Sequence, residues 1–306
     1  MSNKIAVLYG GNSPEREISL ISGNTILNAL KKMGIEAYGL DIRDFPLFLL
    51  KKKKFKKIFI ALHGEGGEDG SIQTILEYLN IPYTGSKSFA SSITFNKFIA
   101  KTLWKEYGLP VYPHVFLRKI DFIKKNYLEI KKNILKLNFP VCVKPNSTGS
   151  SLGISKINNV NYLLDAIKKA FVYSNNILIE KYIEGIEYTV GILGNKTLPS
   201  IKIKSFYSFY NYEAKYIDKN TQYFCPSGLN QYKEKELSEL AMKAWNVLEC
   251  SGWGRVDIIL DKKNNFQLLE INTCPGMTPN SLFPMAAKKA GLSFCDVIDE
   301  ILFLAK

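Results

Sequence analysis

Three residues near the end of the chain have types and spacing that suit a metal ion: Asp257, Glu270 and Asn272. They lie on two apolar runs that flank a polar turn at Lys262–Asn265, a pattern that predicts a β-hairpin. Because Asp257 and Glu270 are equally distant from the centre of that turn, we expect them to face each other across the two strands.

The alternation of side chains along a strand should give this hairpin one polar and one apolar face. Arg255 lies two residues before Asp257 and should share its face. Asn272 lies two residues after Glu270 and should do the same. The apolar face is predicted to consist of Val256, Ile258, Leu269 and Ile271.

Two facing carboxylates repel each other unless a cation lies between them. Oxygen ligands without His or Cys suit Mg²⁺, which usually reaches a protein together with the phosphates of a nucleotide. The hairpin therefore indicates a magnesium and nucleotide site. The alternative is a solvated polar face of an ordinary antiparallel hairpin.

The composition indicates a globular protein of two or three compact units, since the chain has 306 residues and a hydrophobic fraction of 46%. The net charge of +13 (41 − 28) favours anionic ligands. The excess Lys residues lie scattered or in short runs, which is more typical of solvated faces than of a nucleic-acid patch.

Cysteine, histidine and hydropathy patterns point to the cytoplasm. The five cysteines are odd in number and widely spaced, without a CxxC pair, which favours reduced thiols over disulfides or a zinc site. Only two histidines are present, so a multi-His metal centre is excluded. We expect no membrane span and no secretory signal, because no apolar run is long enough and a strand begins directly after the N-terminus.

The first part of the chain repeats a strand, a glycine-containing loop and a helix. Buried strands are predicted at Ile5–Tyr9 and Ile58–Leu62, and Ser13 is expected to cap the first helix. This pattern predicts a parallel α/β domain over residues 1–92, with ligands bound at the carboxyl ends of its strands.

The rest of the chain predicts two further units. Residues 93–185 read as a small antiparallel sheet with helices. Residues 186–306 contain the acidic hairpin, a Tyr-rich loop at Phe206–Pro226 and a last helix that Ser293 should cap together with Asp296.

A glycine-serine loop follows Lys144 at the end of a predicted strand. Glycines let backbone N–H groups turn toward an anion, and the lysine supplies positive charge, so the loop is a candidate phosphate site. It lacks the GxxxxGK(S/T) pattern, and a plain flexible loop is the alternative. Further on, Glu180 and Glu187 could contact an adenine and a ribose, or could be surface charges.

These segments together resemble the ATP-grasp superfamily. More closely, the chain resembles the D-alanine–D-alanine ligase family in the motifs YGGNSPEREISL, ALHGEGGEDGSIQ, PYTGS, YEAKY, QYFCP, GRVD and LEINTCPGMTPNSL. The resemblance runs nearly end to end. It implies an α/β fold in which an N-terminal parallel α/β (pre-ATP-grasp) domain precedes a two-lobed α+β ATP-grasp module, with the Tyr-rich loop as a lid.

The same resemblance implies an activity and a setting. ATP would phosphorylate the carboxylate of a first D-alanine, and the amine of a second would then displace phosphate to give D-alanyl-D-alanine for peptidoglycan precursors. Two Mg²⁺ (or Mn²⁺) ions, a cytoplasmic location and a homodimer are the family's expectations, without a nucleic-acid or membrane partner. An acceptor such as D-lactate and a non-catalytic nucleic-acid-binding role are the alternatives.

The resemblance also implies a role for each matching residue. The metal ligands would be Asp257, Glu270 and Asn272. The nucleotide would be bound by Lys97, Lys144, Ser151, Glu180, Lys181, Ile183, Glu187 and Lys215. The catalytic residues would be Glu15, Ser150, Tyr216, Arg255, Gly276 and Ser281, with His63 and Leu282 as substrate-binding residues.

Within the catalytic set, Glu15 would contact the ammonium of the first D-alanine and form a hydrogen-bonded trio with Ser150 and Tyr216. Arg255 and the Gly276 N–H would stabilise the oxyanion. In the substrate set, Ser281 and the Leu282 backbone would hold the second carboxylate, and His63 would lie near the first substrate.

Two of these residues also have simpler interpretations. Glu15 could be a favourable charge in the first turn of a helix, and His63 could be an ordinary buried, hydrogen-bonded histidine. Cys274 is not expected to be a nucleophile, because this chemistry needs no covalent enzyme intermediate. Tyr216 points to dipeptide rather than ester formation, since ester-forming relatives often carry Phe there.

Overall fold

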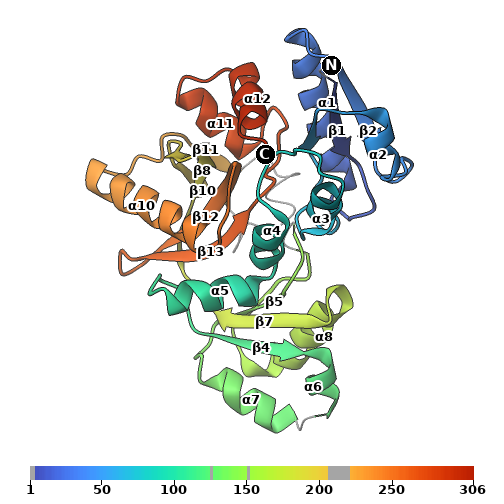
Figure 1. Ribbon diagram of the computed structural model, residues 1–306. Helices are drawn as coiled ribbons and strands as arrows, with labels where there is room; N and C mark the ends of the chain where they lie inside the picture. The colour runs from blue at the N-terminus through green and yellow to red at the C-terminus, as the bar shows by residue number, and fades with distance from the viewer. Residues whose placement is uncertain (1–3, 125–126, 150–151, 206–220) are drawn as a thin grey trace.

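The computed structural model describes residues 4–124, 127–149, 152–205 and 221–306 (Figure 1). It is a mixed α/β molecule with one parallel and two antiparallel sheets. The predicted fold class is therefore confirmed. Among the described residues, no helix combines the length and apolar character needed to cross a membrane.

The N-terminal sheet is parallel and has the strand order β2-β1-β3. Its strands are β1 (Ile5–Tyr9), β2 (Ala37–Asp41) and β3 (Lys57–Ile60). The helices are α1 (Arg16–Lys32), α2 (Leu49–Lys53) and α3 (Ser71–Tyr78), followed by α4 (Ser88–Phe95). The buried runs IAVLY and KIFI form the strands because apolar residues on both faces suit a parallel sheet covered by helices.

The start of the first helix differs from the prediction. Helix α1 begins at Arg16, so the expected cap at Ser13 is wrong. The Ser13 hydroxyl instead donates to the His63 carbonyl oxygen (2.7 Å) and accepts from the Glu15 N–H (3.2 Å). The glycine loop after β1 is thereby tied to the loop after β3, and the two strand ends form one edge of the sheet.

The central sheet is antiparallel, with the strand order β4-β7-β5-β6. Its strands are β4 (His114–Arg118), β5 (Val141–Pro145), β6 (Ser155–Ile157) and β7 (Asn176–Lys181). Its helices are α6 (Lys119–Lys124), α7 (Tyr127–Leu135) and α8 (Leu163–Tyr173), the last preceded by the 3₁₀ turn η1 (Val160–Tyr162). The buried residues Ile134 and Ile167 pack under this sheet.

The C-terminal sheet has the order β11-β10-β8-β12-β13, with β9 paired to β8. Its strands are β8 (Gly185–Leu193), β9 (Lys196–Thr197), β10 (Ile201–Lys204), β11 (Gln222–Phe224), β12 (Trp253–Asp261) and β13 (Phe266–Asn272). Its helices are α10 (Gln231–Val247), α11 (Leu282–Lys289) and α12 (Phe294–Phe303). The predicted capping box of Ser293 and Asp296 is present at α12.

The β12–β13 hairpin has the predicted pairing at its polar end. Asp257 lies opposite Glu270, and Arg255 lies opposite Asn272. Beyond this point a β-bulge shifts the register, so that Ile258 faces Leu268. Leu268, which is fully buried, therefore joins the apolar core in the position predicted for Leu269.

The bulge has a local cause in the turn. The Asn265 carbonyl accepts from the Asp261 N–H (3.0 Å), and Asn264 adopts a left-handed conformation (φ 65°). With this turn, each residue of β12 near the turn pairs with a β13 residue one position earlier than a turn centred on Lys262–Asn265 would give. One extra residue in β13 restores the register at Glu270, as a bulge does.

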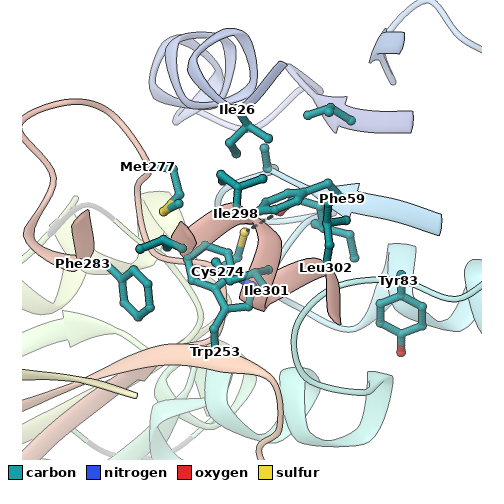
Figure 2. Close-up of a cluster of buried hydrophobic side chains, with 14 of the residues drawn as sticks. Ile26, Phe59, Tyr83, Trp253, Cys274, Met277, Phe283, Ile298, Ile301 and Leu302 are labelled. Carbon is teal, nitrogen blue, oxygen red and sulfur yellow. Dashed lines mark hydrogen bonds between the residues drawn. The ribbon is translucent and has the colours of Figure 1, made fainter. Parts of the chain in front are cut away.

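The N-terminal and C-terminal parts of the chain share one core. Figure 2 shows Phe59 from β3 beside Trp253, with the C-terminal residues Cys274, Phe283 and Ile298 around them. Ring centroids of Phe59 and Trp253 are 6.1 Å apart. The N-terminal domain is thus held directly against the elements that carry the acidic hairpin.

Helix α5 (Lys97–Glu106) lies between the C-terminal sheet and the central sheet (Figure 1). Its Trp104 is fully buried in the C-terminal core and donates from Nε1 to the Ala244 carbonyl oxygen (3.0 Å). Its first residue, Lys97, lies two turns before Trp104 on the same face of the helix and lines the site described next. The domain boundaries at residues 92/93 and 185/186 stay predictions.

Candidate active site

A cavity of about 360 Å³ lies where the N-terminal sheet edge, helix α5 and the β12–β13 hairpin meet. Its walls include many of the predicted site residues. They are Glu15, His63, Lys97, Arg255, Glu270, Asn272, Gly276, Ser281 and Leu282. Segments more than 250 residues apart in the chain therefore meet at one place.

Asp257 lies beneath this cavity and is only 3% exposed. Its carboxylate accepts from Nε and Nη2 of Arg255 (2.8 and 2.9 Å) and from Nδ2 of Asn272 (3.0 Å). The Thr189 hydroxyl donates to Oδ1 at 2.6 Å. Both oxygens of this carboxylate are held in fixed directions, as a metal ligand requires.

The sequence analysis missed Thr189. It lies directly opposite Asp257 on β8, the neighbouring strand of the sheet. A pattern of single residues could not reveal it, because β8 and β12 are separated by more than 60 residues and are paired only in the folded sheet.

Lys97 connects the hairpin to the glycine-serine loop. Its ammonium lies 3.5 Å from Oε2 of Glu270 and donates to the Thr148 carbonyl oxygen at 2.8 Å. A phosphate placed between the loop and the hairpin would therefore meet a positive charge. The contact between Lys97 and a nucleotide phosphate stays a prediction.

The residues of the hairpin fit a magnesium ion that brings further ligands with it. Asp257, Glu270 and Asn272 offer oxygen donors from one face of the two strands. The part of the chain that the structure describes holds no group of three or more His, Cys, Asp or Glu side chains that could bind a metal alone. Phosphate oxygens and water would have to complete the coordination, which is usual for Mg²⁺.

Another part of the cavity wall is acidic and closely packed. A Cβ atom on Gly149 would lie 2.2 Å from Oε2 of Glu15, and one on Gly64 would lie 2.6 Å from the same oxygen. A side chain at either position would have to push the Glu15 carboxylate aside, and Gly64 also needs glycine because its φ is 71°. Glu15 itself is 8% exposed.

Glu68 is a second acidic residue in this part of the wall, and the sequence analysis missed it. It lies on the cavity wall and accepts from the Gly64 N–H at 2.8 Å. Burial, and then the nearby charge of Glu15, raise the pKa of Glu68 to about 8. Two carboxyl groups that share this part of the cavity favour an ammonium ligand. The run HGEGGEDG contains several acids and gives no sign of which one would face inward.

His63 links three segments at the cavity wall. Its Nδ1 lies 2.9 Å from the Cys274 carbonyl oxygen, which can only accept, so Nδ1 carries the proton. Its Nε2 lies 3.2 Å from the hydroxyl of Ser22, which also accepts from the Met277 N–H. Burial lowers the pKa of His63, consistent with a neutral ring. The simple interpretation of His63 as a buried, hydrogen-bonded histidine therefore holds, and its ring also reaches the cavity.

Cys274 has the properties of a structural thiol. Its Sγ donates to the Ile60 carbonyl oxygen (3.3 Å), and burial raises the pKa of the thiol well above its usual value. A nucleophilic cysteine needs the opposite shift. This supports the prediction that Cys274 does not act as a nucleophile.

The start of helix α11 forms another wall. Ser281 is its N-cap residue, and the Ser281 hydroxyl accepts from the Thr278 N–H at 3.0 Å. A Cβ on Gly276 would lie 2.9 Å from that hydroxyl oxygen, so the two residues adjoin. Leu282 is the first helical residue, and the first N–H groups of a helix lack partners within it. These N–H groups and the positive end of the helix dipole suit the binding of a carboxylate.

A second charged cluster lies outside this cavity, between helix α5 and the inner strands β5 and β7 of the central sheet. Lys144 forms a buried ion pair with Glu180, and the ammonium of Lys101 lies 3.2 Å from the other carboxylate oxygen. Burial alone would raise the pKa of Glu180, but Lys101 and Lys144 lower it to about 2. The sequence analysis missed Lys101, although its spacing of four from Lys97 places both on one face of α5.

The other predicted nucleotide residues do not line the cavity. The Lys181 ammonium donates to the carbonyl oxygens of Asn138 (2.8 Å) and Phe139 (3.1 Å), Ile183 is buried, and Glu187 lies on β8. Four predicted residues lie outside the described part of the chain: Ser150, Ser151, Lys215 and Tyr216. The roles assigned to all of these residues stay predictions.

The parallel domain, the two antiparallel sheets and the charged groups between them define an ATP-grasp ligase. The family described as D-ala D-ala ligase C-terminus matches residues 103–303, and D-ala D-ala ligase N-terminus matches residues 47–86. The chain belongs to the D-alanine–D-alanine ligase family.

Individual relatives agree over the full length. D-alanine–D-alanine ligases of two Buchnera aphidicola subspecies are similar to this chain. The ligase of Buchnera aphidicola subsp. Schizaphis graminum is 56% identical over 306 residues, covering 100% of both chains. The ligase of Buchnera aphidicola subsp. Baizongia pistaciae is 55% identical over 305 residues, covering 100% of this chain and 99% of its own.

Solved structures support the same assignment. Two crystal structures of the D-alanine–D-alanine ligase of Bacillus anthracis, the second complexed with ATP, match with TM-scores of 0.87 and 0.85 at 33% and 30% identity. Each match covers 98% of this chain and 96% of the other.

Proposed function

We propose that the protein uses ATP to join two D-alanine molecules into D-alanyl-D-alanine, a building block of peptidoglycan precursors. One observation carries the proposal. A single cavity is lined by the carboxyl groups of Glu15 and Glu68, by the start of helix α11 at Ser281 and Leu282, and by the guanidinium of Arg255. Two amino acids bound in sequence present an ammonium and a carboxylate at opposite ends.

The reaction has two steps. The carboxylate of the first D-alanine takes the γ-phosphoryl group of ATP, which gives an acyl phosphate and ADP. The amine of the second D-alanine then attacks the carbonyl carbon. A C–N bond forms, the C–O bond to phosphate breaks, and the amine loses a proton.

The residues of the cavity have separate tasks in this scheme. Glu15 binds the ammonium of the first D-alanine, and Ser281 with the Leu282 N–H binds the carboxylate of the second. Arg255 and the Gly276 N–H stabilise the negative charge that develops on the carbonyl oxygen. Fixed donors in an enclosed cavity suit this task because they need little reorganisation during the reaction.

Asp257, Glu270 and Asn272 would hold two Mg²⁺ (or Mn²⁺) ions, with Thr189 and Arg255 fixing the Asp257 carboxylate. When bound, the metal ions offset the repulsion between the triphosphate and the attacking carboxylate. Lys97 and Lys144 contact the phosphates, and Glu180, Lys181, Ile183 and Glu187 contact the adenosine. Ser151 and Lys215 also bind the nucleotide in this scheme, and Ser150 and Tyr216 act with Glu15.

The family resemblance further supports a homodimer in the cytoplasm, without a nucleic-acid or membrane partner. The oligomeric state is open to direct measurement by light scattering of the purified protein.

The proposed function is tested with purified protein, ATP, Mg²⁺ and D-alanine, with the product identified by mass. We expect a dimer of D-alanine and one phosphate released per dimer formed. Reactions without ATP, with L-alanine, or with Glu270→Gln protein are the controls. ATP hydrolysis without a dipeptide would contradict the proposal.

The same assay decides the choice of acceptor. Equal concentrations of D-alanine and D-lactate are supplied over a range of pH, and the two products are separated by mass. Dipeptide should dominate at neutral pH. A dominant ester would instead favour the alternative acceptor.

A further inference from the structure

Lys101 is a buried lysine that the proposed reaction does not use. Its side chain is 1% exposed, and its ammonium contacts two different lobes. It lies 3.2 Å from Oε2 of Glu180 on β7 and donates to the Leu268 carbonyl oxygen on β13 at 3.1 Å. Burying a lysine is costly, so a lysine kept at this place indicates a specific task.

Glu180 is shared between two lysines. Lys144 pairs with Oε1 from β5, where the glycine-serine loop begins, and Lys101 pairs with Oε2 from helix α5. All three side chains are less than 10% exposed. The cluster therefore holds two lysines against one carboxylate in a poorly solvated place. Burial lowers the pKa of Lys101, and the charge of Glu180 opposes that shift.

Two further titratable groups among the described residues lie opposite Glu180. Cys142 and His114 lie opposite Glu180 on the neighbouring strands β5 and β4. Burial raises the pKa of Cys142 to about 12 and lowers the pKa of His114, so both favour their neutral forms. Glu270, which adds a negative charge from β13, interacts with both lysines.

We propose that Lys101 is a positioning residue for nucleotide binding: it keeps Glu180 ionised and in place when Lys144 turns from Glu180 to a nucleotide phosphate. The inference rests on the proposed function, which assigns Lys144 to the phosphates and Glu180 to the adenosine. The apparent excess of positive charge in the cluster is then balanced by the ligand.

Replacing Lys101 by Met should expose this task. Without nucleotide, Glu180 still pairs with Lys144, so the variant should fold. When a phosphate takes Lys144, the buried carboxylate loses its remaining cation and takes up a proton instead. Nucleotide binding to the variant is therefore weaker than to wild type at neutral pH. It becomes tighter as the pH falls, with a change in Kd approaching tenfold per pH unit.

The test is a calorimetric titration of ADP with Mg²⁺ between pH 6.5 and 8.5, in buffers of different ionisation enthalpy. These buffers report the number of protons taken up with the nucleotide. We expect Lys101→Met protein to take up close to one proton more than wild type at pH 7, with a Kd that rises with pH. Lys105→Met makes the same change on the exposed face of α5 and should match wild type.

A double variant separates positioning from simple packing. In Lys101→Met/Glu180→Gln protein no carboxylate needs a cation, so the additional proton and the added pH dependence should disappear. If the single variant does not fold, the inference is tested by comparing Glu180→Gln protein with the double variant. We expect the Kd values of these two proteins to differ by less than about twofold, because neither has a buried carboxylate at position 180.

Each outcome has one meaning. A Kd and proton uptake equal to wild type in Lys101→Met protein would overturn the inference, as would a Kd of the double variant that is much weaker than the Kd of Glu180→Gln protein. A wild-type protein that binds no ADP would overturn the proposed function itself.

Discussion

The Thr189 hydroxyl offers a sharp test of the hairpin site, because it touches Asp257 without lining the cavity. Its Oγ1 donates to Oδ1 of Asp257 at 2.6 Å, and the two residues are 1% and 3% exposed. Thr189→Val removes this donor with almost no change in shape. Thr189→Ser keeps the hydroxyl and loses only a methyl group, so it is the matched control.

The expected loss follows from the contacts of the carboxylate. In Thr189→Val protein, Asp257 keeps its bonds from Arg255 and Asn272 but loses its hydroxyl donor. A hydrogen bond to a buried charged group contributes about 2 kcal/mol to stability. For a chain of this size that corresponds to a fall in Tm of about 4 °C. Loss of a hydrogen bond that orients a ligating carboxylate weakens metal binding by ~10–100-fold.

Two measurements check these values. Thermal unfolding without ligand gives the change in Tm, and dipeptide formation against Mn²⁺ concentration gives the half-saturating metal concentration. We expect Thr189→Val protein to recover most of its activity at high Mn²⁺, and Thr189→Ser protein to follow wild type. Unchanged metal dependence in Thr189→Val protein would refute the role of Asp257 as an oriented metal ligand.

Three further changes test other parts of the site. Glu270→Gln should leave the circular dichroism spectrum intact and lower turnover by at least ~10², because it disturbs the charge that holds the metal; near-normal turnover would defeat the assignment. Gly149→Ala places a Cβ 2.2 Å from Oε2 of Glu15 and should raise the KM of the first D-alanine several-fold, with the KM of ATP less affected. The hydrogen bonds from Arg16 lower the pKa of Asp41 to about 2, so this carboxylate stabilises the fold above about pH 4 and loses that effect as the pH falls toward 2. The stability difference between wild type and Asp41→Asn, followed by urea unfolding, should therefore shrink over that range, and a constant difference would contradict it.

The sequence predicts those parts of the molecule that depend on local patterns. The strand, loop and helix repeats predict the parallel sheet, and the polar turn predicts the pairing of Asp257 with Glu270. The exact path of β13 was not predictable in the same way. It depends on the left-handed turn at Asn264, which shifts the strand and makes Leu268 the core residue.

Contacts between distant segments mark the limit of that reasoning. No local sequence motif marks Thr189, Glu68 or Lys101 as a site residue. Each acquires its role from a partner far away in sequence. The family resemblance supplied the roles of Glu15 and Ser281, for which a helix terminus alone gives only a weak indication.

The most direct test of the central claim is a crystal structure with a non-hydrolysable ATP analogue and Mn²⁺, measured at a wavelength where manganese scatters anomalously. Our account predicts manganese peaks about 2.1 Å from the oxygen atoms of Asp257, Glu270 and Asn272, each peak also touching the triphosphate. Anomalous density elsewhere, with these three side chains bound to water or protein groups alone, would contradict it.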